Sequence, residues 1–172
     1  MSELREENIF LIGFMGVGKS TVAPMLAERL GVPLTDMGPL IRARRGGMSS
    51  AQIFDQLGED AYRETETAIL RERLEHKGQV FSCGGGITVR DENVRMMREK
   101  GTVIWLTATP ETILEHLAGD DSRPLLRGRK TPEGIAEFME ERRPLYEKAA
   151  DIQLAVDGMS PEQVVEAIVG IL

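Results

Sequence analysis

The sequence predicts an α/β fold in which helices cover both faces of a parallel sheet of about five strands. Short apolar runs alternate with segments of helical periodicity along all 172 residues, and glycine or proline separates most of them. Strands that are joined through helices run parallel, and a parallel sheet is buried on both faces. No repeat, low-complexity tract or linker divides the chain, so we expect a single domain spanning residues 1–172.

Five segments are expected to be strands because they are short, apolar and bounded by turn residues. Residues 8–13 (NIFLIG) form a continuous apolar run that ends at glycine, which is typical of a buried strand. Residues 79–83 lead into three glycines, and residues 102–106 (TVIWL) are rich in β-branched and aromatic side chains. Residues 32–35 and 152–156 complete the expected sheet.

The helical segments are indicated by apolar periodicity and by residues that start or end helices. Gly31 is an expected C-cap, and Thr109 and the Ser160-Pro161 pair are expected N-terminal signals. Pro24 and Pro144 lie inside expected helices and should perturb them. The expected helices are residues 19–30, 50–57, 60–76, 92–99, 110–117, 131–149 and 160–169.

Residues 13–20 (GFMGVGKS) match G-x-x-x-x-G-K-[ST], the pattern of a phosphate-binding loop, or P-loop. Glycine lets backbone N–H groups approach phosphate oxygens, and the following helix points its positive end at the anion. Lys19 is expected to reach the β- and γ-phosphates of a nucleotide, and the Ser20 hydroxyl to bind Mg²⁺. The expected nucleotide-binding residues are Gly13, Gly16, Val17, Gly18, Lys19, Ser20 and Thr21.

The P-loop by itself leaves several protein classes open, because GTPases, motor ATPases and small-molecule kinases all contain it. The chain has no N-K-x-D sequence to recognise guanine, which disfavours a small GTPase. A formal net charge of −7 opposes binding to nucleic acid or to an anionic membrane. Residues 123–130 contain four basic residues and no acidic one, which is typical either of a solvated loop or of a small-anion site.

Cysteine content and hydropathy lead us to expect a cytoplasmic protein. The single cysteine, Cys83, excludes an internal disulfide and fits a reducing cytosol. No apolar run has the 18 or so residues that a membrane span needs, and the first residues lack a signal-peptide pattern. Cys83 and Trp105 are expected in the core, while His76 and His116 are expected at the surface without metal-site spacing.

Further motifs follow the P-loop in a fixed order along the chain. They are GVPLTD at 31–36, IF at 53–54, GE at 58–59, YR at 62–63 with Glu66, GGG at 84–86, SRPLL at 122–126 and RRPLY at 142–146. Each segment alone is weak, and their joint order is specific. In order and spacing they match the pattern of shikimate kinases, so the chain resembles that family from about residue 9 to residue 172.

The resemblance implies roles for several charged residues. Arg63 and Arg142 look like the arginines that bind the substrate carboxylate, which suits the bidentate geometry of guanidinium groups. Glu66 looks like the acid that orients these arginines. Arg123 looks like the lid arginine that contacts ATP phosphates and stabilises charge on the transferring group. Taken singly, Arg63 and Glu66 could be a surface pair at i, i+3, and Arg142 could be a solvated helix residue.

The resemblance also implies a glycine contact and a lid. Gly84, Gly85 and Gly86 look like the substrate-binding glycines, with the backbone of the last two approaching the substrate. Without the resemblance, this run could be only a strand-to-loop turn. Residues 119–132 look like a mobile lid that excludes water.

The sequence departs from the family pattern after the second expected strand. Shikimate kinases usually have Asp-x-Asp there, where the first Asp supports Mg²⁺ and the second holds substrate hydroxyls. Alignment on the flanking residues makes Asp36 the first Asp and Gly38 the second, so the second carboxylate is missing. In the alternative register Asp36 is the second Asp and Leu34 stands for the first. We favour the first register because it needs fewer inserted residues before residue 53.

We therefore predict a three-layer α/β P-loop kinase that transfers the γ-phosphate of Mg·ATP to a hydroxyl of shikimate. Lys19, Asp36 and Arg123 are the expected catalytic residues, with Ser20 and Asp36 at the metal and Asp36 also at the substrate. Three alternatives are open: a kinase for another carboxylate-bearing molecule, a related kinase for gluconate or a nucleoside monophosphate, and a non-catalytic nucleotide-binding relative. SRPLL and RRPLY disfavour the second of these. A monomer is expected.

Overall fold

The computed structural model describes residues 6–120 and 123–172, and its central element is a parallel sheet. The strand order is β2-β3-β1-β4-β5, and every neighbouring pair is parallel. The predicted α/β class and the predicted five strands are confirmed. The strands are β1 (Asn8–Ile12), β2 (Leu34–Asp36), β3 (Val80–Ser82), β4 (Gly101–Thr107) and β5 (Ile152–Ala155).

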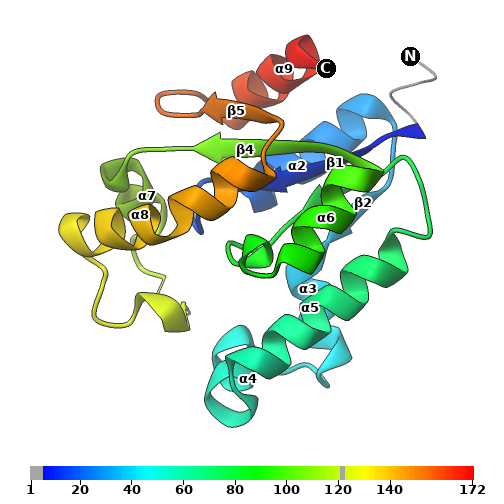
Figure 1. Cartoon of the computed structure of the whole chain (residues 1–172). Helices are drawn as coiled ribbons and strands as arrows, with labels where there is room; N and C mark the ends of the chain where they lie inside the picture. Colours follow the sequence, from blue (N-terminus) through cyan, green and yellow to red (C-terminus); the bar gives the residue numbers. More distant parts are fainter. Residues whose placement is uncertain (1–5, 121–122) are drawn as a thin grey trace.

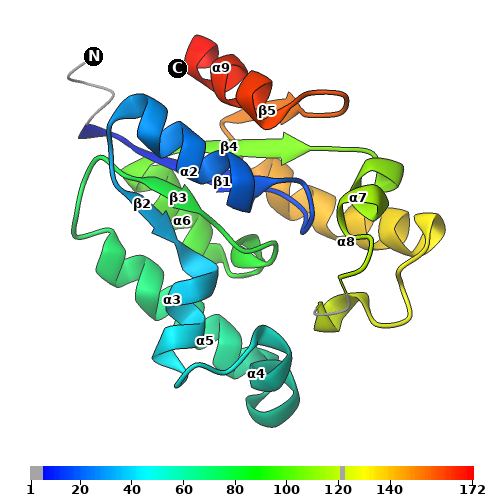
Figure 2. The ribbon, with the colours of Figure 1, turned by 180° about the vertical axis from the view of Figure 1, so that it is seen from behind.

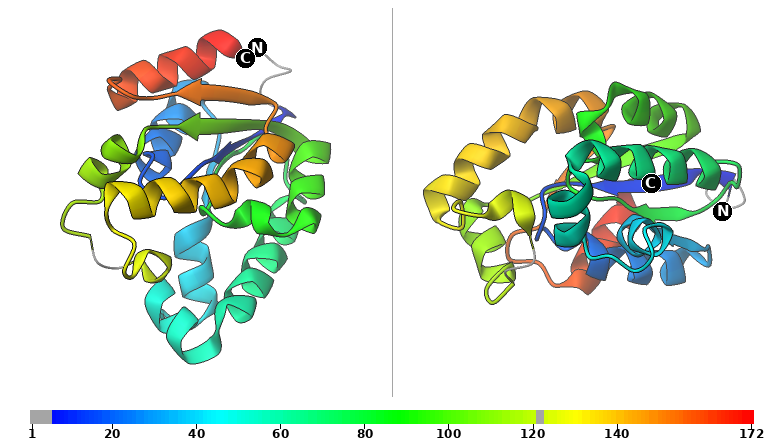
Figure 3. Two further views of the ribbon diagram at one scale, coloured as in Figure 1. Left: turned by 60° about the vertical axis from the view of Figure 1, so that its left-hand side comes forward. Right: turned by 90° about the horizontal axis from the view of Figure 1, so that it is seen from below.

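Helices pack on both faces of this sheet. In the described part of the chain they are α2 (Lys19–Leu30), α3 (Met37–Arg44), α4 (Ser50–Leu57), α5 (Glu59–Arg73), α6 (Asp91–Lys100), α7 (Pro110–His116), α8 (Pro132–Ala149) and α9 (Pro161–Ile171), with 3₁₀ turns at Ile87–Val89 and Pro124–Leu126. Helices α6 and α8 lie in front of the sheet in Figure 1, and α2 and α9 lie in front of it in Figure 2. Figure 3 shows α3, α4 and α5 grouped at the end of the molecule opposite α9.

The two faces of the sheet bury two separate hydrophobic clusters, because side chains alternate along each strand. On β1, Ile9 and Leu11 belong to the cluster beneath α2 and α9, whereas Phe10 and Ile12 belong to the cluster beneath α5 and α6. The Phe10 and Phe81 rings pack with their centroids 4.7 Å apart. Cys83 and Trp105 are buried in the second cluster, as the sequence predicts.

The predicted helix ends are confirmed by their hydrogen bonds. Gly31 adopts a left-handed conformation (φ 68°) at the end of α2, and its N–H donates to carbonyls of the last turn. The Thr109 hydroxyl accepts from the Thr112 N–H at 3.2 Å at the start of α7. Ser160 and Gln163 form a reciprocal capping box at the start of α9.

Two features of the helices differ from simple sequence rules. Helix α3 was missed, because Gly38 and Pro39 suggest a turn. Both residues lie in its first turn, where backbone N–H groups have no partner inside the helix, so proline costs little there. Helices α2 and α8 continue past Pro24 and Pro144, each of which removes only one helical donor.

Replacement of Gly101 by alanine should destabilise the fold by about 2–3 kcal/mol, because it overpacks the pairing of β1 with β4. A Cβ at Gly101 would lie 2.1 Å from the Asn8 backbone oxygen, and this oxygen belongs to the paired strand. The control is Gly170→Ala in α9, where a Cβ meets nothing within 4 Å. It should be neutral or stabilising by up to about 1 kcal/mol. Urea unfolding midpoints test this, and equal effects at the two sites would contradict it.

Candidate active site

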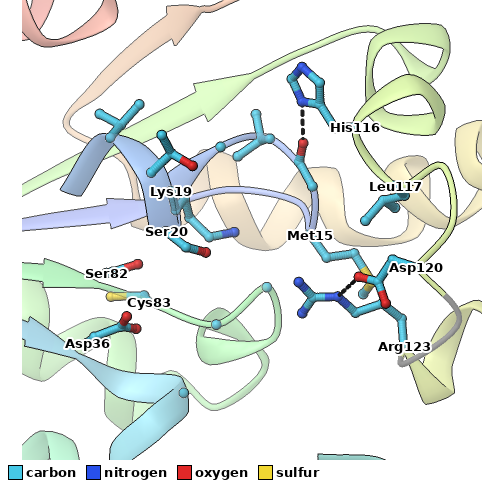
Figure 4. A pocket seen from close by; sticks show the side chains of 18 of the residues that line it. Met15, Lys19, Ser20, Asp36, Ser82, Cys83, His116, Leu117, Asp120 and Arg123 are labelled. Carbon is cyan, nitrogen blue, oxygen red and sulfur yellow. Dashed lines mark hydrogen bonds and ion pairs between the residues drawn. The ribbon is translucent and has the colours of Figure 1, made fainter. Parts of the chain in front are cut away.

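The carboxyl ends of β1, β2 and β3 meet at one edge of the sheet, where ligands bind in folds of this type. Strand β1 lies between β3 and β4 in the sheet, although the chain passes from β1 to β2 at the edge. A cavity of about 620 Å³ opens at this edge. It is lined by Lys19 and Ser20 at the start of α2, by Asp36 at the end of β2 and by Arg123, so three different segments of the chain contribute (Figure 4).

The glycines of the P-loop are needed for different physical reasons. Gly18 has φ 113°, and a Cβ there would meet nothing within 4 Å, so only its backbone conformation requires glycine. A Cβ at Gly13 would lie 2.5 Å from the Leu106 backbone oxygen, and one at Gly16 would lie 2.8 Å from Leu117 Cγ. The loop is therefore held closely against β4 and α7.

The predicted nucleotide residues 16–21 all line the 620 Å³ cavity, and Gly13 does not. Gly13 instead contributes through its carbonyl, which accepts a hydrogen bond from Lys19 Nζ. Lys19 Nζ also donates to the Phe14 carbonyl at 3.2 Å, and Lys19 is only 7% exposed. Burial lowers the pKa of Lys19 to about 7, and the Arg123 charge acts in the same direction. An anion in this cavity would stabilise the charged amine.

Ser20 and Asp36 face the cavity next to Lys19 (Figure 4). Partial burial raises the pKa of Asp36, and the Arg42 charge and the Gly38 N–H oppose this shift. Within residues 6–120 and 123–172 no group of three His, Cys, Asp or Glu side chains could hold a metal ion. Mg²⁺ in phosphoryl-transfer sites typically takes one or two protein ligands together with phosphates and waters. A hydroxyl and a carboxylate therefore fit Mg²⁺ in such a site.

A second cavity of about 340 Å³ lies beside the first and shares Met15, Gly85 and Arg123 with it. Arg63 and the run 84–86 line this second cavity. Two cavities with a common boundary suit a reaction between two ligands, one at the P-loop and one at Arg63. Neither Glu66 nor Arg142 is among the lining residues.

Arg63 and Glu66 form a buried ion pair on α5, which answers the alternative that they are a surface pair. Arg63 Nη1 donates to Glu66 Oε1 at 3.1 Å, and their exposed fractions are 5% and 0%. Burial raises the pKa of Glu66, and the Arg63 charge opposes it. The position of Arg63 is therefore held by a carboxylate that is itself beyond the reach of solvent.

Arg142 lies on α8 next to this pair and adds a further positive charge. Its guanidinium lies over the Phe138 ring at 5.2 Å. Burial lowers the pKa of Arg142, and the Arg63 charge adds to this effect. Among the described residues, Arg142 Nη1 and Glu66 Oε2 are buried without a hydrogen-bond partner. An unpartnered buried guanidinium nitrogen is a donor that a carboxylate of a ligand would satisfy.

The glycine run after β3 brings backbone close to both cavities. The Tyr146 hydroxyl donates to the Gly85 carbonyl at 2.7 Å and fixes the turn against α8. A Cβ at Gly85 would lie 3.3 Å from the Met15 nitrogen in the P-loop. One at Gly84 would lie 3.1 Å from Glu66 Oε2. Residues 84–86 are therefore more than a turn, because their backbone contacts the P-loop on one side and the Arg63–Glu66 pair on the other.

Gly86→Ala should displace Arg63 and raise the KM for an acceptor that Arg63 binds about 10- to 100-fold, the loss expected for one charged hydrogen bond. A Cβ at Gly86 would lie 2.2 Å from Arg63 Nη2, while Glu66 holds the same guanidinium. In an Arg63→Met background the obstruction is gone, so Gly86→Ala should have little further effect. Steady-state kinetics of the four proteins test this. Additive losses would contradict the steric explanation.

Within the predicted lid, residues 119–132, Asp120 and Arg123 line the first cavity, and Arg123, Pro124 and Leu125 line the second. The mobility of the lid stays a prediction. Arg123 Nε is 3.4 Å from Asp120 Oδ2. Arg127 forms two hydrogen bonds to Asp55 on α4, at 2.9 and 3.0 Å. Ser122, part of the SRPLL segment, lies outside the described residues.

Several residues that line the first cavity were not predicted from the sequence. His116 is exposed, as expected, but its Nδ1 also forms a 2.6 Å hydrogen bond with the Gly16 carbonyl of the P-loop. No local pattern connects two residues that are 100 positions apart. The other unpredicted lining residues include Tyr62, Ser82, Val156, Met159, Pro161 and Val164.

The parallel sheet, the P-loop after β1 and the adjoining arginine-lined cavity together define a P-loop kinase. The family model described as "Shikimate kinase" matches residues 15–172. The chain belongs to the shikimate kinase family.

Similar proteins cover almost the whole chain. A shikimate kinase of Persephonella marina is 43% identical over 163 residues, which are 95% of this chain and 97% of that protein. A shikimate kinase of Geobacter sulfurreducens is 43% identical over 161 residues, covering 94% and 88% of the two chains. The structure of the Acinetobacter baumannii shikimate kinase in complex with shikimate superposes with a TM-score of 0.92 at 29% identity, covering 99% of this chain and 94% of that one.

Proposed function

We propose that the protein transfers the γ-phosphoryl group of ATP to a hydroxyl of shikimate, yielding ADP and 3-phosphoshikimate, a step of aromatic amino acid biosynthesis. The observation that carries this proposal is the buried Arg63–Glu66 pair with Arg142 beside it. Arg63 lines the second cavity, which adjoins the cavity of the P-loop. Arg63 also pairs with the partly exposed Glu59 at 3.3 Å, while Nη1 of Arg142 has no partner among the described residues and is a donor for a carboxylate-bearing acceptor. Relatives named shikimate kinase that match over nearly their full length support the same acceptor.

The residues around the first cavity suit the phosphates of ATP. Lys19 and the free N–H groups at the start of α2 would hold the β- and γ-phosphates. Ser20 and Asp36 would hold Mg²⁺, which supplies positive charge against the triphosphate. Arg123 lines both cavities and is suited to stabilise charge on the group in transfer. The predicted nucleotide residues Val17 and Thr21 complete the wall of this cavity.

The acceptor residues follow from the second cavity. Arg63 would bind the carboxylate together with Arg142, Glu66 would orient both, and the run 84–86 would offer backbone to the acceptor. Asp36 ends β2 on the side of Ser20, which favours its role as the first Asp of the family pair, with Gly38 in the place of the second. Phosphoryl transfer relies mainly on positioning and charge stabilisation, so one missing carboxylate is compatible with activity.

The proposal also covers a closing lid, the cellular location and the oligomeric state. Closure of residues 119–132 over both ligands would exclude water from the reaction. No helix in the described part of the chain could span a bilayer. We propose a monomer that works in the cytosol on a small molecule.

The experiment is ADP release from Mg·ATP with and without shikimate, with the phosphorylated product identified by mass spectrometry. Shikimate should accelerate ADP release, and D-gluconate and a nucleoside monophosphate at equal concentration should not. ADP release that stays at its basal rate with shikimate, in protein that is folded and binds ATP, would refute the proposed acceptor. Acceleration by gluconate instead would identify the related kinase class.

A further inference from the structure

Gly38 is a glycine that the backbone of α3 does not require. It lies in the first turn of that helix and is absent from the residues with positive φ. Glycine inside a helix costs up to about 1 kcal/mol relative to alanine. Any requirement for glycine at residue 38 therefore comes from the space that a side chain would fill.

The space beside Gly38 is taken by the guanidinium of Arg42, one helical turn later. A Cβ at Gly38 would lie 3.3 Å from Arg42 Nη1. This separation is tight yet tolerable after a small movement of Arg42, and a longer side chain at residue 38 would compete for the position of the guanidinium. The absence of a side chain at Gly38 therefore leaves room for the guanidinium of Arg42.

Arg42 lies where the two cavities meet. It lines the cavity of Lys19 and Asp36 and also the cavity of Arg63. Its side chain is half-buried, and within residues 6–120 and 123–172 it forms no hydrogen bond or ion pair. Burial raises the pKa of Asp36, and the positive charge of Arg42 opposes this shift. Five N–H donors thus border the junction between nucleotide and acceptor.

We propose that Arg42 is a specificity-determining residue of the acceptor site, and that it donates hydrogen bonds to an oxygen of the acceptor in the space that Gly38 leaves free. This inference rests on the proposed function and refines its substrate class. Arginine can only donate, so the acceptor must present an oxygen with a free lone pair at the junction. A hydroxy acid such as shikimate meets this requirement, and an acceptor with an ammonium group there does not.

The test compares wild type, Arg42→Met, Gly38→Asp and the double variant, by kinetics and by calorimetric binding of shikimate. Arg42→Met should raise the KM and Kd for shikimate about tenfold or more, the loss of a charged hydrogen bond, and leave the KM for ATP within about twofold. Gly38→Asp alone should also weaken shikimate binding, because the new carboxylate pairs with Arg42 at i, i+4. In the double variant this pairing is impossible, so Asp at residue 38 should improve binding over Arg42→Met alone.

The control is Arg44→Met on the same helix, whose guanidinium is exposed and paired with Glu72 at 2.7 Å. It should leave shikimate binding unchanged, and urea unfolding should show that Arg42→Met is as stable as wild type. Shikimate KM and Kd within twofold of wild type in Arg42→Met would overturn the role of Arg42, while shikimate-dependent ADP release in the same protein would leave the proposed function intact. Absence of both binding and turnover in wild type would overturn both; binding without turnover would refute only the kinase activity.

Discussion

Lys19→Met is expected to lower kcat/KM for phosphoryl transfer by about 100- to 1,000-fold, the loss found when one preorganised donor is removed from a transition state. The Lys19 side chain at the start of α2 is only 7% exposed, so solvent screens its attraction to phosphate less than at the surface. Methionine has similar length and fills the same volume, so the loss measures the charge. The measurement is ADP release with saturating shikimate.

The same substitution removes a buried charge but also leaves the Gly13 and Phe14 carbonyls without their donor, so the stability of the protein without ligands should stay within about 2 kcal/mol of wild type. ATP with Mg²⁺ should raise the melting temperature of wild type and not that of the variant. Lys77→Met, at an exposed position outside both cavities, is the matched control and should change neither property. A Lys19→Met protein that keeps its activity would contradict the assigned role, and one destabilised by more than about 2 kcal/mol would contradict the expected stability.

Arg63→Met should weaken shikimate binding by about 100-fold, the loss of a charged hydrogen bond. It should also destabilise the protein by about 3–5 kcal/mol, since it leaves the carboxylate of Glu66 buried without its partner. The double variant Arg63→Met/Glu66→Leu removes both charges and should regain much of this stability, but not shikimate affinity. Urea unfolding and calorimetric binding of shikimate separate the two effects. Recovery of binding in the double variant would show that Arg63 does not hold the acceptor.

Arg142→Met should behave differently, because the Nη1 of Arg142 has no hydrogen-bond partner among the described residues. We expect a KM for shikimate about 30- to 100-fold higher, as for loss of one charged hydrogen bond, and stability within about 1 kcal/mol of wild type. Arg143→Met is the control: this neighbouring arginine is exposed and pairs with Glu140 at 2.6 Å. Equal effects of the two variants on shikimate KM would place Arg142 outside the acceptor site.

Local sequence signals were sufficient for the nucleotide end of the site. The strand 8–12, the loop 13–20 and the helix after it are contiguous, so the chain itself arranges the backbone N–H groups and Lys19. The caps at Gly31, Thr109 and Ser160 were predictable for the same reason, because each acts on residues no more than four positions away. Helix α3 was missed because the rule against proline in helices does not apply to the first turn.

The acceptor end could be predicted only through the family resemblance, and its physical basis became visible in the tertiary structure. In sequence, Arg63 and Glu66 are consistent with a surface pair, and only the packing of α5 shows that both are buried. The need for glycine at residue 86 depends on a guanidinium 23 positions away. The link between His116 and the P-loop spans 100 positions.

The sequence by itself thus determined the fold class, the strands and the phosphate loop, whose interactions lie within a few residues of each other. The tertiary structure decided which charges are buried, which glycines make room for a neighbour and which side chains meet at the junction of the two cavities. Periodicity reports which face of a helix or strand is apolar. Which side chains are buried, and which of them contact each other, depends on the order of strands in the sheet. This order brings together residues that no local pattern connects.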